Sequence, residues 1–413
     1  MKLLKLSPYY APERISSSHL STDMAAAYVA EGITTEVYAP TPTRGVSNEE
    51  RNTYKKIKYE ELENGLVIVR RFDMFREGRN PIGRAVRYML VHVAHYIKGV
   101  RAKEVDVIAT HSTPPTQGVL CALVAKRLSK KYKRPVRFVF DLQDMFPESL
   151  VSTGLCKESS ILYKIGDKIS DYTYRHADRI RVISDSMKET LIKKGVPAEK
   201  ITVIYNWIDT DATTPIERDT NPLFDELDLP RDNFYVTYAG NLGNSQNVDV
   251  LIACAKALKE YSNICFVIFG GGSEKDKFEK KLADSNLTNI HLFPLQPVER
   301  VSQVYSLGDV SFVTCKKGVG VGAFPSKAVS IMATATPIIA SFDLDSDLCR
   351  IVAENEVGLC ADAEDVQGAV DAILTYYTNK DLCTQHGANA RRLACARFSK
   401  EAGTAANIAL LKN

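Results

Sequence analysis

Short apolar runs alternate with helix-like segments along most of this chain, and no other feature limits its fold as strongly. Residues 2–6 form such a run, a helix-like segment covers 19–30, and a second run covers 35–39. Strands that alternate with helices are typical of parallel sheets, because a parallel connection has to cross over the sheet. The same alternation starts again at residue 234. We therefore expect an α/β protein with two Rossmann-like, doubly wound sheets in tandem.

A change of composition predicts the domain boundaries. Between residues 210 and 233, Asp, Thr, Pro and Glu dominate and apolar residues are few, as is typical of a linker. We expect an N-terminal domain at 1–208, a linker region at 209–233 and a C-terminal domain at 234–396. The segment 397–413 reads as a final helix, which we expect to pack back toward the N-terminal domain. Two such domains imply a ligand cleft between them.

Composition excludes several classes of function. The 413 residues include 53 basic and 50 acidic side chains, and this near balance does not favour a general nucleic-acid binder. The nine cysteines are scattered without a CxxC pair, which indicates buried thiols in a reducing cytoplasm and neither disulfides nor a zinc site. Residues 1–12 are too short and too soon interrupted by proline for a signal peptide. No window offers the roughly 18 apolar residues that a membrane span needs.

The segment 84–103 reads as an amphipathic helix. Its apolar positions are Val86, Met89, Leu90, Val93, Ala94, Ile97 and Val100, and its basic residues are Arg84, Arg87, Lys98, Arg101 and Lys103. Basic residues beside an apolar stripe suit an anionic membrane surface. The commoner arrangement in an α/β domain is that the stripe packs on the sheet, and this is the interpretation we favour. The first interpretation would place the protein at the inner face of the plasma membrane.

The stretch from Gly318 to Ser341, GVGVGAFPSKAVSIMATATPIIAS, carries the strongest sign of a ligand. A glycine-rich loop can present backbone N–H groups to a diphosphate, and the N-terminus of the following helix adds a positive dipole end. Lys327, in the first turn of that helix, would add a full charge. The alternative is an ordinary loop–helix–strand unit, because glycine loops occur wherever backbones crowd.

Two polar residues follow neighbouring predicted strands in the N-terminal half. His111 comes after the run 106–110, and Asp144 comes after the run 136–140. Ligands of open parallel sheets bind beyond the carboxyl ends of strands, so the two side chains are candidates for substrate orientation or proton handling. Alternatively, His111 satisfies a loop backbone and Asp144 caps the segment that follows it.

Laid out in this order, the sequence resembles the glycosyltransferases of the GT-B fold, specifically family 4 (group 1). The resemblance covers nearly the whole chain. Its markers are Ser184-Asp185, Gly195-Val196-Pro197, Asn206-Trp207-Ile208-Asp209, Tyr238-Ala239-Gly240-Asn241-Leu242-Gly243, Gly270-Gly271-Gly272, Pro325-Ser326-Lys327 and Pro337-Ile338-Ile339. The element Asp144-Met145-Phe146-Pro147-Glu148-Ser149 is similar to one in a bacterial subgroup that includes L-fucosamine and related aminosugar transferases of O-antigen and capsule assembly.

The resemblance implies a retaining transfer from a UDP-sugar, as co-substrate, without a metal or another cofactor. It places the nucleotide in the C-terminal domain and the acceptor in the N-terminal domain. The catalytic candidates are His111, Asp144 and Lys327. The donor-binding candidates are Gly240, Asn241, Gln246, Gly270, Gly271, Gly272, Pro294, Leu295, Gly322, Ala323, Phe324, Ser326 and Ser330. The acceptor-side candidates are Glu13, Ser16 and Ser17.

Three departures from the family pattern bear on these roles. The family's Glu-x7-Glu pair is absent, because Gly322 and Ser330 occupy its positions. Asn241 and Gln246 stand where many members carry Arg and Lys. These changes assign charge neutralisation to Lys327, to backbone amides of residues 321–324 and to the helix dipole. The loop at 13–18, ERISSS, lacks the usual glycine pair, so serine hydroxyls replace backbone contacts there.

The predicted function is transfer of an N-acetylated aminosugar from a UDP-sugar to a polyprenyl-diphosphate-linked saccharide in bacterial surface polysaccharide biosynthesis. One alternative keeps the fold and changes the reaction, as in UDP-N-acetylglucosamine 2-epimerases, which would convert a nucleotide sugar without an acceptor. The other is a degenerate transferase that serves as a binding partner in a polysaccharide-assembly complex, which would gain no stability from UDP.

Overall fold

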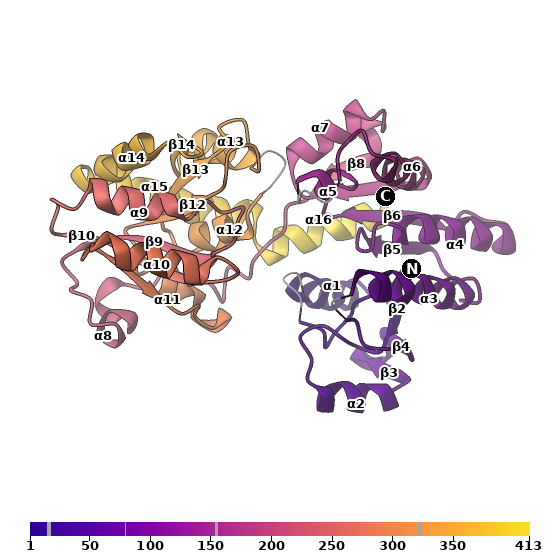
Figure 1. Ribbon diagram of the computed structural model, residues 1–413. Coiled ribbons are helices and arrows are strands. Elements are labelled where there is room, and N and C mark those ends of the chain that lie inside the picture. The colour runs from indigo at the N-terminus through magenta and orange to yellow at the C-terminus, as the bar shows by residue number, and fades with distance from the viewer. Residues whose placement is uncertain (15–17, 79, 153–155, 321–323) are drawn as a thin grey trace. The chain divides into compact units, whose positions relative to one another are not determined.

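The computed structural model describes residues 1–14, 18–78, 80–152, 156–320 and 324–413 (Figure 1). The chain divides into two compact units. The first unit holds Met1–Tyr205 and Thr404–Asn413, and the second holds Asn206–Gly403. Each unit contains a parallel sheet with helices packed against it, so the prediction of two Rossmann-like α/β sheets in tandem is confirmed.

The first unit is built on an eight-stranded sheet with the order β3-β4-β2-β1-β5-β6-β7-β8. Its strands are β1 (Lys2–Leu6), β2 (Thr34–Pro40), β3 (Tyr59–Leu62), β4 (Val67–Phe72), β5 (Val107–His111), β6 (Arg137–Leu142), β7 (Arg179–Val182) and β8 (Ile201–Val203). Its helices are α1 (Ser18–Ala30), α2 (Asn48–Lys56), α3 (Pro81–Gly99), α4 (Gln117–Tyr132), α5 (Glu148–Ser152), α6 (Ile161–His176) and α7 (Asp185–Lys193). The central strands β1 and β5 are mostly buried and apolar, as in other parallel sheets, and Lys5 of β1 is a buried charged exception.

The outer edge of this sheet departs from the parallel pattern. Strand β3 pairs with β4 in the antiparallel sense, and helix α2 precedes it. Neither element was predicted, because α2 contains no buried residue and β3 is exposed along most of its length. An element that buries few side chains has no hydrophobic periodicity from which it could be predicted.

The second unit contains a six-stranded parallel sheet with the order β11-β10-β9-β12-β13-β14. Its strands are β9 (Phe234–Asn241), β10 (Ile264–Gly271), β11 (Ile290–Phe293), β12 (Val310–Thr314), β13 (Ile338–Phe342) and β14 (Gly358–Asp362). Its helices are α8 (Leu223–Glu226), α9 (Asp249–Ala257), α10 (Lys275–Ser285), α11 (Val301–Tyr305), α12 (Ser326–Ala333), α13 (Asp347–Glu354), α14 (Val366–Thr378) and α15 (Lys380–Arg397). The last helix, α16 (Lys400–Lys412), begins in the second unit and ends in the first.

Residues 206–233, most of which were expected to form a linker, count with the second unit. The side chain of Asn221 is buried and donates from Nδ2 to the carbonyl oxygen of Gln303 at 2.8 Å. Arg391 on α15 donates to the carbonyl oxygens of Thr210 and Thr213, both at 2.9 Å. Polar groups of this segment therefore form hydrogen bonds with the rest of the second unit.

Helix α3 contradicts the favoured interpretation of its sequence. The residues that face the sheet are Arg87, Val91 and His95, all of which are fully buried. The apolar stripe of Val86, Met89, Leu90, Val93 and Ile97 is instead exposed. The expectation that this stripe packs on the sheet is therefore wrong, and the polar side chains that replace it are hydrogen-bonded to the sheet and its loops.

Candidate functional site

The second unit gathers most of the predicted donor-binding residues at the carboxyl ends of its strands. Gly240 and Asn241 end β9, Gly270 and Gly271 end β10, and Pro294 follows β11. The neighbours β9 and β10 run in register, with Gly270 opposite Gly240 and Gly271 opposite Asn241. The parallel sheet therefore brings these loops to one edge, which is where open α/β sheets bind ligands.

Lys327 lies at this edge, and no anionic side chain of the described residues pairs with it. Its Nζ is buried and has no hydrogen-bond partner among the described residues. The same atom lies 4.1 Å from the centre of the Tyr238 ring, so the aromatic face is its nearest favourable contact. Removal from water lowers the pKa of Lys327 from 10.5 to about 8. A buried ammonium group with an unused set of donors is suited to an anionic ligand.

Glycines make room for Lys327 and for the neighbouring loop. A Cβ on Gly240 would lie 2.8 Å from Lys327 Nζ, and Gly240 has a φ of 144°, a region that other residues rarely adopt. Gly272 has the same φ, and a Cβ there would lie 2.2 Å from Asn241 Oδ1. Gly270 packs so closely on Leu242 that a Cβ would lie 2.5 Å from Leu242 Cδ1. The predicted glycines are therefore needed for close packing of the loops themselves.

The remaining donor-side candidates are placed around this edge. Asn241 Nδ2 approaches Gln246 Oε1 at 3.4 Å, so these two amide side chains contact each other. Pro294 and Leu295 are exposed, and Leu295 lies over Gly271. Ser326 and Ser330 belong to α12, and Phe324 stacks on Phe398 with a centroid distance of 5.4 Å. Gly322 and Ala323 lie outside the described residues.

Asp343 fixes the beginning of the glycine loop, a role that the sequence did not suggest. Its two carboxylate oxygens accept from the backbone N–H of Gly318 at 2.8 Å and of Gly320 at 2.7 Å. Lys316 N donates to the carbonyl oxygen of Ser245 at 2.9 Å, which joins this loop to the loop after β9. The sequence did offer one indication of this role. Asp343 directly follows β13, and polar residues just after a strand are candidates for a site at the edge of the sheet.

In the first unit, His111 is paired with a residue that the sequence analysis missed. His111 and Asp141 are opposite each other in the register of β5 and β6, and His111 Nδ1 lies 2.8 Å from Asp141 Oδ2. Arg181 Nη1 donates to the same oxygen at 3.1 Å. Burial opposes ionisation of Asp141, but Arg181 and His111 outweigh it and lower the pKa of this carboxyl well below its ordinary value. An ionised Asp141 accepts a hydrogen bond from the N–H of His111 Nδ1, so His111 Nε2 is left to contact another group.

Asp144 lies near His111 without contacting the same groups. Its backbone N–H donates to Ser112 Oγ at 3.3 Å, and Gln143 N donates to the same hydroxyl at 3.1 Å. The Asp144 carboxylate makes no hydrogen bond or ion pair to the described part of the chain, and the residue is exposed. The loops after β5 and β6 are therefore joined through Ser112, which keeps His111 and Asp144 on neighbouring loops.

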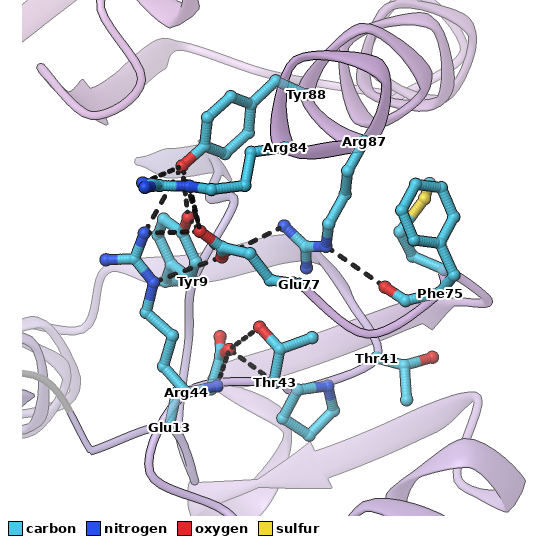
Figure 2. Close-up of polar contacts among 12 residues, drawn as sticks. Tyr9, Glu13, Thr41, Thr43, Arg44, Phe75, Glu77, Arg84, Arg87 and Tyr88 are labelled. Carbon is cyan, nitrogen blue, oxygen red and sulfur yellow. Dashed lines mark hydrogen bonds and ion pairs between the residues drawn. The ribbon is translucent and has the colours of Figure 1, made fainter. Parts of the chain in front are cut away.

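A pocket of about 230 Å³ opens beside β1 and is lined by Tyr9, Tyr10, Ala11, Pro12, Glu13, Arg14, Ser21 and Thr22. Glu13 contributes to its wall mainly as a brace, because its Oε1 accepts from Thr43 N, Thr43 Oγ1 and Arg44 N at 2.6, 3.0 and 3.0 Å. Figure 2 shows this carboxylate enclosed by the loop at 43–44. Ser16 and Ser17, the other acceptor-side candidates, lie outside the described residues.

A second carboxylate, Glu77, forms ion pairs with three arginines and accepts a hydrogen bond from the Tyr9 hydroxyl (Figure 2). Arg44 Nη2 donates to Glu77 Oε1 at 2.8 Å, Arg84 Nε lies 3.0 Å from the same oxygen, and Arg87 Nη1 lies 3.8 Å from Oε2. Burial opposes ionisation of Glu77, but the bonds from Arg44 and Tyr9 and the nearby arginine charges lower its pKa. The group connects the pocket wall to the first turns of α3.

The described residues contain neither a candidate metal site nor a candidate membrane span. No three His, Cys, Asp or Glu side chains in this part of the chain lie together as a metal site requires. None of the helices that the structure describes combines the length and the apolar character of a membrane span.

Two family models match consecutive parts of the chain. The model of glycosyltransferase family 4 matches residues 19–212, and the model of group 1 glycosyl transferases matches residues 219–393. Between them they cover every strand of the two sheets except β1, which precedes the first match. The first match contains His111 and Asp141, and the second contains Gly240 and Lys327.

Curated relatives and a solved structure agree with these models. The chain is 26% identical over 274 residues to WcaI of Escherichia coli strain K12, a colanic acid biosynthesis glycosyl transferase, and 25% identical over 261 residues to the glycosyltransferase WbjE of Pseudomonas aeruginosa. The alignments cover 64% and 62% of this chain, and 65% and 62% of those proteins, so the chain spans less than two thirds of their lengths. HepE of Anabaena, solved in complex with UDP, shares the fold over 100% of both chains, with a TM-score of 0.72 and 17% identity.

Proposed function

Since this chain belongs to the group 1, family 4 glycosyltransferases of the GT-B fold, we propose that it transfers a sugar from a UDP-sugar to a saccharide acceptor in bacterial glycan biosynthesis. The observation that carries the proposal is Lys327, a buried cation at the strand ends of the second unit that has no hydrogen-bond partner in the part of the chain that the structure describes. The relatives WcaI and WbjE support the biosynthetic setting.

The proposed role of Lys327 is to bind the diphosphate of the donor. The hardest step of sugar transfer is departure of the nucleoside diphosphate, because an additional negative charge develops on the terminal phosphate oxygen as its bond to the sugar breaks. Because Lys327 has no ion pair within the described ranges, its positive charge is available to that oxygen. Asn241, Gln246 and the backbone amides of the glycine loop complete the proposed donor site, with Pro294 and Leu295 beside the base.

We propose that the transfer retains the configuration of the sugar and needs no metal. In this mechanism the bond between the anomeric carbon and the UDP oxygen breaks, and the acceptor hydroxyl oxygen bonds to the same face of that carbon. The hydroxyl proton passes to the departing phosphate oxygen. This route needs no carboxylate pair, which accommodates Gly322 and Ser330 in place of two glutamates.

The first unit is proposed to bind the acceptor. Asp141 orients His111 and favours the imidazole with a proton on Nδ1, so that Nε2 can accept a hydrogen bond from a sugar hydroxyl. The exposed carboxylate of Asp144 is a second candidate for that task, and the pocket at Tyr9 to Thr22 has room for part of a saccharide. An N-acetylated aminosugar donor and a polyprenyl-diphosphate-linked acceptor remain parts of this proposal that rest on the family resemblance.

The test compares Lys327→Ala with Lys277→Ala, which removes an exposed lysine of α10. A panel of UDP-sugars is screened by thermal shift, and UDP release is then measured with a lipid-linked saccharide extract as acceptor. We expect Lys327→Ala to lower transfer by about two to three orders of magnitude, as for loss of one preorganised electrostatic group. Lys277→Ala should behave as the unmodified protein. Turnover of Lys327→Ala at the unmodified rate would overturn the assignment.

A further inference from the structure

Three arginines of the first unit share the single carboxylate of Glu77. Arg44 donates to it from Nη2 at 2.8 Å and from Nε at 3.2 Å. Arg84 Nε lies 3.0 Å from the same carboxylate, and Arg87 Nη1 lies 3.8 Å from it. Figure 2 shows the three guanidinium groups on different sides of Glu77. We call Arg44, Arg84 and Arg87 the arginine cluster. Its three positive charges face one negative charge, so positive charge is in excess.

Arg87 is the member of the cluster with unused hydrogen-bond donors. Its side chain is fully buried, and its Nε donates to the carbonyl oxygen of Phe75 at 3.2 Å. Its Nη1 and Nη2 have no hydrogen-bond partner among the described residues. Folded proteins rarely leave buried donors in this state, because such groups have lost their hydrogen bonds to water without a replacement. An oxyanion beside Arg87 would supply the missing acceptors.

Two further arginines add positive charge beside the cluster. Burial and the charges of Arg87 and Arg76 lower the pKa of Arg51 below its ordinary value, so these guanidinium groups act on one another. The carboxylates of Glu13 and Asp73 oppose this effect and contribute less than the two arginines. The hydrogen bonds of Arg51 go to backbone carbonyl oxygens, which carry no net charge. The surroundings of the cluster therefore also favour an anion.

The cluster adjoins the pocket beside β1 through Tyr9. The Tyr9 side chain lines that pocket, and its hydroxyl donates to Glu77 at 2.8 Å and lies 2.8 Å from the Tyr88 hydroxyl. The guanidinium carbon of Arg44 lies 4.2 Å from the centre of the Tyr9 ring. The side chains of Arg44 and Arg84 are 34% and 43% exposed, so solvent reaches this side of the cluster. A sugar in the pocket would therefore have cationic groups beside it.

We propose that the arginine cluster binds an oxyanion group, a carboxylate or a phosphate, on a sugar ring of the acceptor. Guanidinium groups bind both oxyanions through paired N–H donors. The inference rests on the proposed function, in which the first unit binds the acceptor, and it adds that this acceptor is an acidic saccharide. A neutral saccharide would leave the excess charge and the two Arg87 donors without a partner.

The experiment measures saccharide binding to the full chain by NMR titration, without a nucleotide sugar. The probes are methyl glucuronide, a phosphate ester of glucose, neutral methyl glucoside and inorganic phosphate. We expect one of the two acidic sugars to bind about tenfold or more tightly than methyl glucoside, as for one hydrogen bond to a charged group. The tighter of the two identifies the oxyanion. Inorganic phosphate should bind more weakly than that sugar, because it leaves the pocket empty.

The variant Arg84→Gln removes a half-exposed member of the cluster and leaves Arg87 beside Glu77. We expect it to lose most of the preference for the acidic sugar, again by about tenfold. The matched control is Arg175→Gln, which removes an exposed arginine of α6 that pairs with Asp171. It should bind all four probes as the unmodified chain does. An unchanged thermal transition verifies that each variant is folded.

Three results would overturn the proposal. Acidic and neutral sugars could bind equally, or Arg84→Gln could keep the full preference of the control. Inorganic phosphate could also bind as tightly as the acidic sugar, which would assign the cluster to a free anion. Lys327→Ala distinguishes this inference from the proposed function, because it should lose transfer and still bind the acidic sugar as the unmodified chain does.

Discussion

The burial of Lys327 costs folding free energy that its surroundings offset only in part. Burying an ammonium group without an acceptor is unfavourable, and the Tyr238 ring offsets only part of that cost. Lys327 has its ordinary pKa of 10.5 in the unfolded chain, and burial lowers this pKa to about 8 in the folded chain. The free energy of unfolding contributed by this group therefore rises with pH between these two values.

The same pKa gives a prediction for UDP binding. A bound diphosphate favours the protonated lysine, so above pH 8 the protein has to take up a proton when UDP binds. We expect the affinity for UDP to be constant below pH 8 and to fall by up to about tenfold per pH unit above it. Titration calorimetry between pH 7 and 9 measures this. Lys327→Ala should lack the decline, and an equal decline in both proteins would refute the assignment.

Gly240 offers a test of the close approach at the strand end. Gly240→Ala introduces a Cβ at 2.8 Å from Lys327 Nζ and strains a backbone with a φ of 144°, so we expect a loss of about 1–3 kcal/mol of stability together with weakened UDP binding. Gly32→Ala is the control, because Gly32 has a φ of 63° and no atom within 4 Å of an added Cβ. It should lower the melting temperature and leave UDP binding unchanged. Equal UDP affinities in the two variants would contradict the account.

Lys327 was predicted from its sequence motif, whereas Asp141 could not be predicted from the sequence around it. Asp141 lies inside β6, where a carboxylate interrupts an apolar run and has no helical or turn signal around it. Its partnership with His111 depends on the register of β5 and β6, which no local pattern specifies. Asp343 was missed for a similar reason, since its role is to accept from backbone N–H groups of a distant loop.

Helix α3 shows that an amphipathic pattern specifies two faces and does not say which one is buried. The apolar stripe was available to either the sheet or a partner, and polar contacts from Arg87 and His95 decided the orientation. Helix α2 and strand β3 were missed because they bury almost nothing. Elements that contribute to a core are predictable from periodicity, and elements on an edge are not.

Glu77 should be essential for the anchoring of α3. Glu77→Gln removes the carboxylate shared by Arg44, Arg84 and the fully buried Arg87. We expect a loss on the order of 3 kcal/mol in the free energy of unfolding, because Arg87 keeps its charge in the interior. Urea unfolding measures the change. Asp225→Asn, which breaks an exposed pair with Arg231, should have little effect, and equal values for the two variants would show that the Glu77 group is not needed.

Across the whole molecule, the alternation of strands and helices was sufficient to predict two parallel sheets. The segment 206–233 was harder to interpret, because a polar composition is typical of linkers and also of segments that hydrogen-bond to a domain surface. The two family models, which match residues 19–212 and 219–393, agree with the division into two units. The proposed function needs both units, since the candidate donor and acceptor residues belong to different ones.

The central claim is that the chain moves a sugar from UDP to an acceptor by means of Lys327. The most direct measurement follows the radiolabelled sugar of the UDP-sugar selected by thermal shift into the organic-extractable fraction of a bacterial lipid extract. We expect incorporation that depends on the protein and falls by about two to three orders of magnitude in Lys327→Ala. Conversion of the UDP-sugar without any acceptor, or equal incorporation by both proteins, would contradict it.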